Sequence, residues 1–147
     1  MKIICAPGAF KDVLTPFQAE EQISRAFRKV FPQAKLISMP LADGGEGTNE
    51  VLLGLRNGKR IQAVTTDAIG RDIIAEYISL DSHTAVIEAA QAIGFSQLPQ
   101  AELNPYNTSS WGVGLLIRHA ITQGYRRIYG VRFRYEGLQS RSRCFQG

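Results

Sequence analysis

The first forty residues contain a strand, a helix and a second strand in an order that strongly constrains the fold. Residues 2–6 form a short β-branched run that is typical of a buried strand. Residues 16–30 carry apolar side chains at helical spacing, and Thr15 with Gln18 predicts a capping box at the start of that helix. Residues 35–39 form the second strand. Because one helix joins the two strands, they are predicted to be parallel.

The rest of the chain changes from alternating strands and helices to consecutive strands. This change predicts an α/β fold in which a Rossmann- or flavodoxin-like portion with a parallel sheet is followed by part of a second α/β subdomain. The expected division places residues 1–66 in the first domain and 67–131 in an incomplete second one. The later elements are a helix from about Thr48, strands at 59–66, 72–80 and 84–88, a short helical piece at 89–93, a helix capped by Ser109 or Ser110 with Ile121 on its apolar face, and a strand at 127–131.

Composition excludes several classes of protein. Hydrophobic residues make up 44% of the 147 and charged residues 20%, which is close to the average of globular proteins and unlike that of disordered chains. No apolar run is long enough to cross a bilayer or to form the core of a signal peptide, so a cytoplasmic protein without a membrane partner is expected.

Cys5 and Cys144 have no metal-ligand spacing, and Cys5 is predicted to be buried. His83 and His119 are expected at the surface.

The net charge of +4 is concentrated in residues 132–147, which contain four arginines and one glutamate. A basic segment with interleaved Phe133 and Tyr135 could bind nucleic acid through phosphate contacts. A solvated tail without a partner is the alternative, and no nucleic-acid partner is expected.

The segment Asp43-Gly44-Gly45-Glu46-Gly47-Thr48, between a predicted strand and a predicted helix, is the strongest candidate site. Its glycines allow positive φ angles and close approach of a ligand, and the start of the following helix offers unpaired N–H groups and a positive dipole end. Asp43 and Glu46 would suit Mg²⁺ coordination or general-base chemistry on a hydroxyl. The alternative is an ordinary turn with acidic residues at a helix start.

Lys11 lies in a second loop, residues 6–14, which follows the first strand. The carboxyl ends of parallel strands share one edge of a sheet, so Lys11 would face an anion held by the glycine segment. A solvated lysine is the alternative.

Together these segments resemble the bacterial type of glycerate kinase over residues 1 to about 131. The Asp-Gly-Gly-Glu-Gly-Thr string is the most specific match, and the others are strong only jointly. They are Ala6-Pro7, Phe10-Lys11, Pro40 to Thr48, Val64-Thr65, Gly70, Ala85 to Ala90, Gly94, Asn104-Pro105, Thr108-Ser109, Gly112 to Gly114 and Gly124 to Ile128.

The resemblance implies transfer of a phosphoryl group from ATP, with Mg²⁺, to a hydroxyl of D-glycerate, in a cleft between two α/β domains. It implies that Asp43 is nearest the reacting hydroxyl or the metal. It also implies that Glu46 either binds the metal directly or contacts a residue that does. Lys11 would stabilise a phosphate or the substrate carboxylate. Gly44, Gly45 and Gly47 would supply backbone amides, with Thr48 completing the binding segment.

Two departures from the family pattern matter. Gly8 and Ala9 stand where the family has an acid and a small hydroxyl residue. The family also continues after the last matching strand with a Gly-Gly-Ser-Ala-Thr-x-Asp segment, whereas Val131 is followed here by Arg132-Phe133-Arg134. Codons able to encode 132–137, shifted by one nucleotide, encode Gly-Ser-Ala-Thr-Lys-Asp.

We therefore expect residues 132–147 to be an out-of-frame tail and the chain to be a truncated, inactive fragment of the enzyme. Such a fragment would expose apolar surface and self-associate. A non-catalytic nucleotide- or phosphate-binding module is the alternative function.

Overall fold

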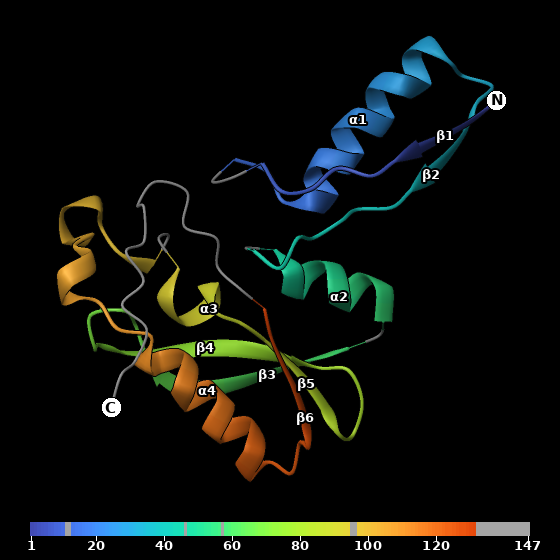
Figure 1. The fold of residues 1–147 in the computed structure, drawn as a ribbon. Coiled ribbons are helices and arrows are strands. Elements are labelled where there is room, and N and C mark those ends of the chain that lie inside the picture. The colour runs from blue at the N-terminus through green and yellow to red at the C-terminus, as the bar shows by residue number, and fades with distance from the viewer. Residues whose placement is uncertain (11–12, 46, 57, 95–96, 132–147) are drawn as a thin grey trace, which may run out of the picture.

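The computed structural model describes residues 1–10, 13–45, 47–56, 58–94 and 97–131. Strand β1 (Lys2–Cys5), helix α1 (Pro16–Val30) and strand β2 (Lys35–Ser38) form an arm, and β1 and β2 pair in parallel over four residues each. Figure 1 shows this arm projecting beyond the rest of the chain. The predicted strand-helix-strand unit and its parallel pairing are confirmed.

The helix of the arm begins as its sequence predicts. The Thr15 hydroxyl accepts a hydrogen bond from the Gln18 N–H at 3.3 Å, and the Gln18 side chain accepts one from the Thr15 N–H at 2.9 Å. This is the reciprocal capping box, which satisfies N–H groups that the first helical turn leaves free. Cys5, at the end of β1, is a buried free thiol as expected.

A four-stranded sheet forms the larger part of the structure. Its strand order is β3-β4-β5-β6, where the first two pairings are antiparallel and β5 pairs with β6 in parallel. The elements after the arm are helix α2 (Thr48–Arg56), strands β3 (Lys59–Thr66), β4 (Asp72–Ser79) and β5 (Thr84–Glu88), helix α3 (Ala90–Ile93), 3-10 helices η2 (Gln100–Glu102) and η3 (Pro105–Asn107), helix α4 (Trp111–Thr122) and strand β6 (Arg127–Val131).

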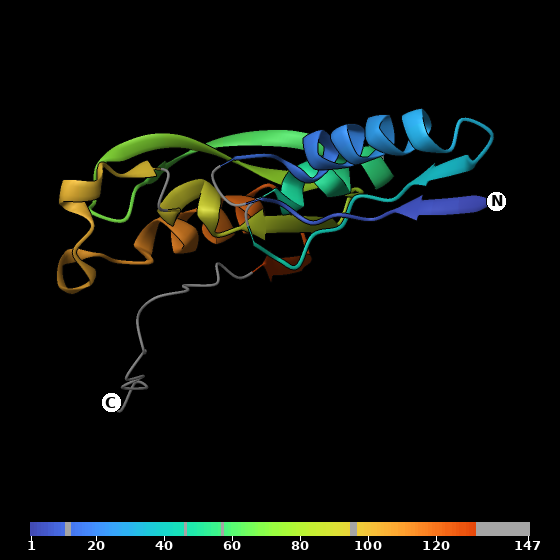
Figure 2. The same ribbon diagram turned by 90° about the horizontal axis from the view of Figure 1, so that it is seen from above.

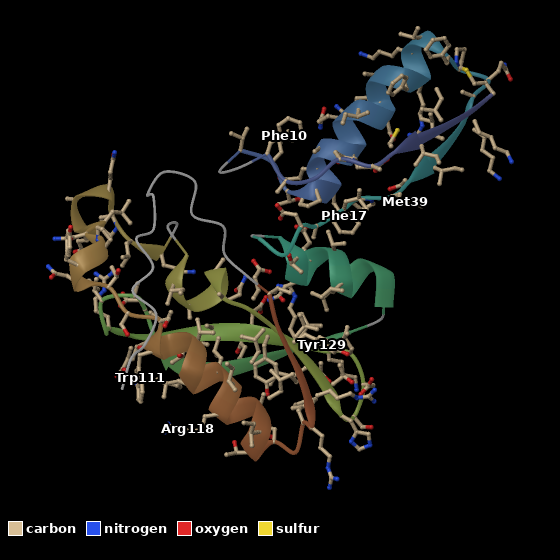
Figure 3. All side chains as sticks on the ribbon, viewed as in Figure 1. Phe10, Phe17, Met39, Trp111, Arg118 and Tyr129 are labelled. Carbon is tan, nitrogen blue, oxygen red and sulfur yellow. The ribbon has the colours of Figure 1, made fainter. Side chains whose placement is uncertain are left out.

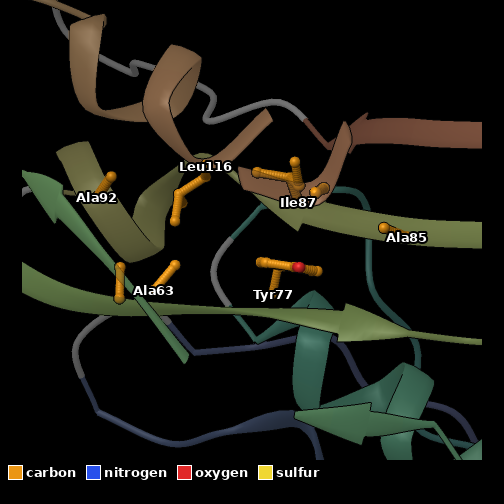
Figure 4. Close-up of a cluster of buried hydrophobic side chains, with 8 residues drawn as sticks. Ala63, Tyr77, Ala85, Ile87, Ala92 and Leu116 are labelled. Carbon is orange, nitrogen blue, oxygen red and sulfur yellow. The ribbon is translucent and has the colours of Figure 1, made fainter. Parts of the chain in front are cut away.

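The main core lies between this sheet and helices α3 and α4 (Figure 4). Tyr77 and Ile87 of the sheet and Leu116 of α4 are fully buried there. The Tyr77 hydroxyl lies 3.2 Å from Nδ1 of His119, so this polar group keeps a partner inside the core. His119 is therefore half-buried rather than a surface residue, and that expectation was wrong; His83 is exposed, as expected.

Helix α2 contacts β4 and β5 on the face opposite to this core. Side chains alternate along a strand, so Ile78 faces away from the core that Tyr77 enters, and Val86, its partner on β5, does the same. Every residue of β5 is buried, because helices cover both of its faces. Figure 1 shows α2 between the arm and the sheet, and Figure 2, the view from above, shows the arm extending past the sheet toward the N-terminus.

Most predicted elements are present within one or two residues of their expected bounds, and the α/β class is confirmed. The sheets, however, divide between β2 and β3. Strand β3, placed in the first domain by the expected boundary at residue 66, pairs along its full length with β4. The domain division itself stays a prediction. Ile121, expected on the apolar face of α4, is 58% exposed, and that expectation was wrong.

The part of the chain that the structure describes contains no helix long and apolar enough to span a membrane.

Candidate functional site

Two loops lie together at the carboxyl ends of the paired strands of the arm. One follows β1 and contains Phe10; the other follows β2 and leads into α2 (Figures 1 and 3). The Leu41 N–H donates to the carbonyl of Pro7 at 3.0 Å and so connects the two loops. The parallel pairing brings them to one edge, as the sequence predicts. Lys11, expected on the first loop, lies outside the described residues.

The loop after β2 closes in a tight turn. The Asp43 carboxylate accepts a hydrogen bond from the Gly45 N–H at 3.0 Å, and the Thr48 hydroxyl donates to the Gly45 carbonyl at 2.7 Å. Gly44 and Gly47 have φ angles of 92° and 90°, values that strongly favour glycine. The side chain of Asp43 is exposed, so its second oxygen can reach a ligand. Asp43 is thus exposed, Gly44, Gly45 and Gly47 are half-buried and Thr48 is buried, and none of these residues lies in a strand.

The helix start that follows this turn is held by a carboxylate from the other sheet. Glu88, the last residue of β5, is 0% exposed. Its two oxygens accept hydrogen bonds from the N–H groups of Gly47 and Asn49, at 3.1 and 2.8 Å. A negative group at a helix N-terminus is favoured by the helix dipole and by the free N–H donors there. Glu88 therefore joins the glycine turn to the four-stranded sheet.

Asn49 adds an unusual feature at the same place. Its side chain is 3% exposed, and neither its carboxamide oxygen nor its nitrogen has a hydrogen-bond partner among the described residues. Burying an unpartnered amide costs free energy, and such groups in native structures deserve a specific explanation.

Helix α1 supports the turn from the arm. Cδ of Pro16 would lie 3.2 Å from a Cβ at position 47, so only a glycine fits between the turn and α1 without a shift. The Thr15 hydroxyl also lies 3.4 Å from the carboxylate of Glu50 in α2. The turn is consequently fixed from both sides, by α1 and by Glu88.

The structure brings Asp43, Gly44, Gly45, Gly47 and Thr48 into one turn at the junction of a sheet edge and a helix start. The amides of Gly45 and Gly47 already donate to carboxylates of the chain itself, those of Asp43 and Glu88. Glu46, the second expected metal ligand, lies outside the described residues, and within them no group of three or more potential ligands could hold a metal ion.

Sequence reasoning assigned no role to Glu88 or Asn49. The available signal was a carboxylate at the end of a strand whose other members, Thr84 to Ile87, are small or apolar. A charge in such a run needs partners, but these partners are about forty residues away in the sequence.

The arrangement is that of an α/β protein with a candidate small-molecule site where parallel strands end and a helix begins. The sequence matches the model of the glycerate kinase family over residues 3–130. This chain belongs to the glycerate kinase family.

Individual relatives agree with this assignment. A glycerate kinase of Bacillus subtilis (strain 168) is 42% identical over 129 residues, which cover 87% of this chain and 34% of that protein. The glycerate 2-kinase of Escherichia coli (strain K12) is 38% identical, with coverages of 87% and 34%. A crystal structure of a protein assigned as glycerate kinase 2 in Salmonella typhimurium LT2 superposes with a TM-score of 0.67 at 39% identity, covering 89% of this chain and 35% of that one.

The chain thus spans about a third of the length of the relatives it matches.

Proposed function

We propose that residues 1–131 form the N-terminal part of a glycerate kinase, which transfers the terminal phosphoryl group of ATP to a hydroxyl of D-glycerate. The observation that carries this proposal is the turn from Asp43 to Thr48, which presents an exposed carboxylate at the end of a parallel strand pair. In phosphoryl transfer the protein mainly positions groups and balances charge, and one well-placed carboxylate suits that task. The reaction would take place in the cytoplasm, where ATP and Mg²⁺ are available.

Asp43 is the proposed residue nearest the reacting hydroxyl. One of its oxygens is fixed by the Gly45 N–H, so the other has a defined direction in which to accept a proton or bind a cation. Mg²⁺ is commonly bound by one or two carboxylates together with substrate phosphates, and Asp43 fits that pattern. Bound there, the ion would neutralise charge on the phosphates. Glu46 is proposed as a second ligand and Lys11 as a cation for the phosphate or the substrate carboxylate.

A chimaera tests this function. Residues 1–131 would be joined to the part of the Bacillus subtilis glycerate kinase that lies beyond its matched third, and ADP release would be followed with ATP, Mg²⁺ and D-glycerate. The expected result is D-glycerate-dependent turnover that Asp43→Asn abolishes and that Asp72→Asn, at an exposed carboxylate at the start of β4, leaves unchanged. Full turnover by the Asp43→Asn chimaera would contradict the role of Asp43. An inactive parent chimaera would contradict the function.

A non-catalytic nucleotide- or phosphate-binding module is the second candidate, because the chain spans only a third of its relatives. Calorimetric titration of the 147-residue chain with ATP and with D-glycerate separates the two. ATP binding by this chain, combined with an inactive chimaera, would favour the module.

Self-association is also proposed, through the apolar side chains that the arm and the sheet edge leave exposed. Among the described residues the arm is a two-stranded parallel sheet without a further strand at either edge, whereas parallel sheets are almost always covered. Sedimentation velocity should show dimers or larger species, and a monomer at all concentrations would contradict it. The exposed side chains on these elements are Ile4, Met39, Leu41 and Tyr129.

A further inference from the structure

We propose that Glu88 is the positioning residue of the candidate site: its carboxylate holds the Asp43–Thr48 turn against the four-stranded sheet and thereby sets where Asp43 lies. This inference rests on the proposed function, because it assigns a purpose to the position of Asp43. The proposed action of Glu88 runs through the backbone N–H groups of Gly47 and Asn49.

The first argument is the chemistry of Glu88 itself. A fully buried carboxylate is costly unless it is well hydrogen-bonded, and charge-assisted bonds to backbone N–H groups are among the strong ones. Both oxygens of Glu88 accept such bonds, at 3.1 and 2.8 Å, from the first residues of α2. At an exposed helix start, an uncharged side chain could accept these hydrogen bonds equally well. A buried carboxylate at this position therefore indicates that strong and directional hydrogen bonds are needed to hold the helix start.

The second argument is the pattern of bonds around the turn. The bonds from Gly45 to Asp43 and from Thr48 to Gly45 lie within the turn and fix only its shape. The bond from Leu41 to Pro7 attaches the preceding segment to the arm. Glu88 makes the attachment to the four-stranded sheet, across 41 and 39 residues of sequence. The packing of α2 on β4 and β5 holds the helix to the same sheet, and Glu88 adds the hydrogen bonds that fix the turn at the start of the helix.

The third argument is location. Glu88 ends β5 and pairs in register with Val131, the last residue of β6, so it lies where two parallel strands end. Figure 1 shows the start of α2 above this end of the sheet. A ligand that touches both the arm and the sheet would therefore depend on the geometry that Glu88 sets.

The test uses the 147-residue chain and D-glycerate as the probe, with amide signals followed by ¹H–¹⁵N NMR. Glu88→Gln removes the charge and places an NH₂ group against an N–H donor. We expect D-glycerate to bind the folded variant about tenfold more weakly, a change that corresponds to about 1.4 kcal/mol. The amide signals of Gly47 and Asn49 should move upfield, since they lose a carboxylate acceptor.

Two control variants separate positioning from simple loss of stability. Glu76→Gln removes a carboxylate on β4 that pairs with Arg60 and should leave binding unchanged. Thr65→Val removes the buried hydrogen bond from Thr65 to the Gly112 carbonyl, 2.6 Å long and remote from the turn. It should lower the melting temperature and leave the affinity for D-glycerate unchanged.

Each outcome decides between the two proposals. Unweakened binding by folded Glu88→Gln, or equal weakening by Thr65→Val, overturns the positioning role and leaves the proposed function standing. No D-glycerate binding by the wild-type chain overturns the proposed function, and the positioning role falls with it. If Glu88→Gln does not fold, amide exchange of Gly47 and Asn49 in the wild-type chain decides: slower exchange with D-glycerate supports the role, and unchanged exchange overturns it.

Discussion

Helix α4 approaches strand β3 so closely that Gly112 tests the packing of the main core. A Cβ added at this position would lie 1.9 Å from the carbonyl oxygen of Thr66 and 3.3 Å from the hydroxyl oxygen of Thr65. Both are parts of the sheet that cannot swing away, since the Thr66 oxygen is backbone and the Thr65 hydroxyl donates to the Gly112 carbonyl. Gly112→Ala therefore forces the start of α4 about 1.1 Å away from β3 before the nearest contact reaches 3.0 Å.

The expected cost follows from three contributions. Overpacking of a close interface costs about 1–3 kcal/mol. The displacement also breaks the buried bond between Thr65 and Gly112, which contributes about 1 kcal/mol. Alanine in a helix regains about 0.5–1 kcal/mol relative to glycine. The net expectation is a loss of about 2 kcal/mol of unfolding free energy, or roughly 8 °C in melting temperature for a domain of this size.

Thermal unfolding followed by circular dichroism at 222 nm measures the effect, and Gly114→Ala is the matched control. Gly114 lies two residues further along the same helix, and a Cβ there would meet nothing within 4 Å. Gly114→Ala should gain only the stability that comes from the higher helix propensity of alanine, and it should melt about 2–4 °C higher than the wild type. Equal melting temperatures of the two variants would refute the close approach of α4 to β3.

Two further substitutions test buried polar groups. Burial acts to raise the pKa of Asp67, but hydrogen bonds from the Arg71 side chain and from the N–H groups of Arg71 and Ile69 hold that pKa below its ordinary 3.8. This stabilisation is present above pH 3.8 and lost as the pH falls further, so Asp67→Asn should melt below the wild type at pH 7, and the difference should shrink as the pH is lowered below 3.8; a constant difference would contradict this. Asn49→Leu removes a buried amide that has no hydrogen-bond partner among the described residues. Its free energy of unfolding should equal that of the wild type or exceed it by up to about 1 kcal/mol. A melting temperature several degrees below that of the wild type would show that the amide has partners.

Local signals in the sequence predicted the arm well. Thr15 and Gln18 form the capping box because its geometry needs only four consecutive residues. The parallel pairing of β1 with β2 follows from the helix between them, a rule of connection that does not depend on the rest of the fold. The glycine turn was likewise found from its composition, and two of its glycines have the positive φ angles that this composition favours.

Features that depend on distant residues could not be predicted in the same way. Strand β3 follows the arm in sequence but pairs with β4, and nothing within 59–66 indicates which sheet it joins. Helical spacing placed Ile121 on the apolar face of α4, yet Ala120 beside it is fully buried in the core while Ile121 is 58% exposed, so the face that packs is narrower than the run of apolar residues. The bonds of Glu88 join residues 39 and 41 positions apart, beyond the range of any periodic pattern.

The N–H groups of Gly47 and Asn49 already donate hydrogen bonds to Glu88, and this limits how the candidate site can bind an anion. A phosphate at the start of α2 and the carboxylate of Glu88 would need the same N–H donors, those of Gly47 and Asn49. Displacing Glu88 would leave a fully buried carboxylate without these two bonds, which is far costlier than leaving a phosphate in water. An anionic substrate would therefore be bound by side chains of the two loops that follow β1 and β2 rather than by the N–H groups at the start of α2. In the proposed role the turn directs the Asp43 carboxylate, and the positive end of the α2 dipole is neutralised by Glu88 rather than by a ligand.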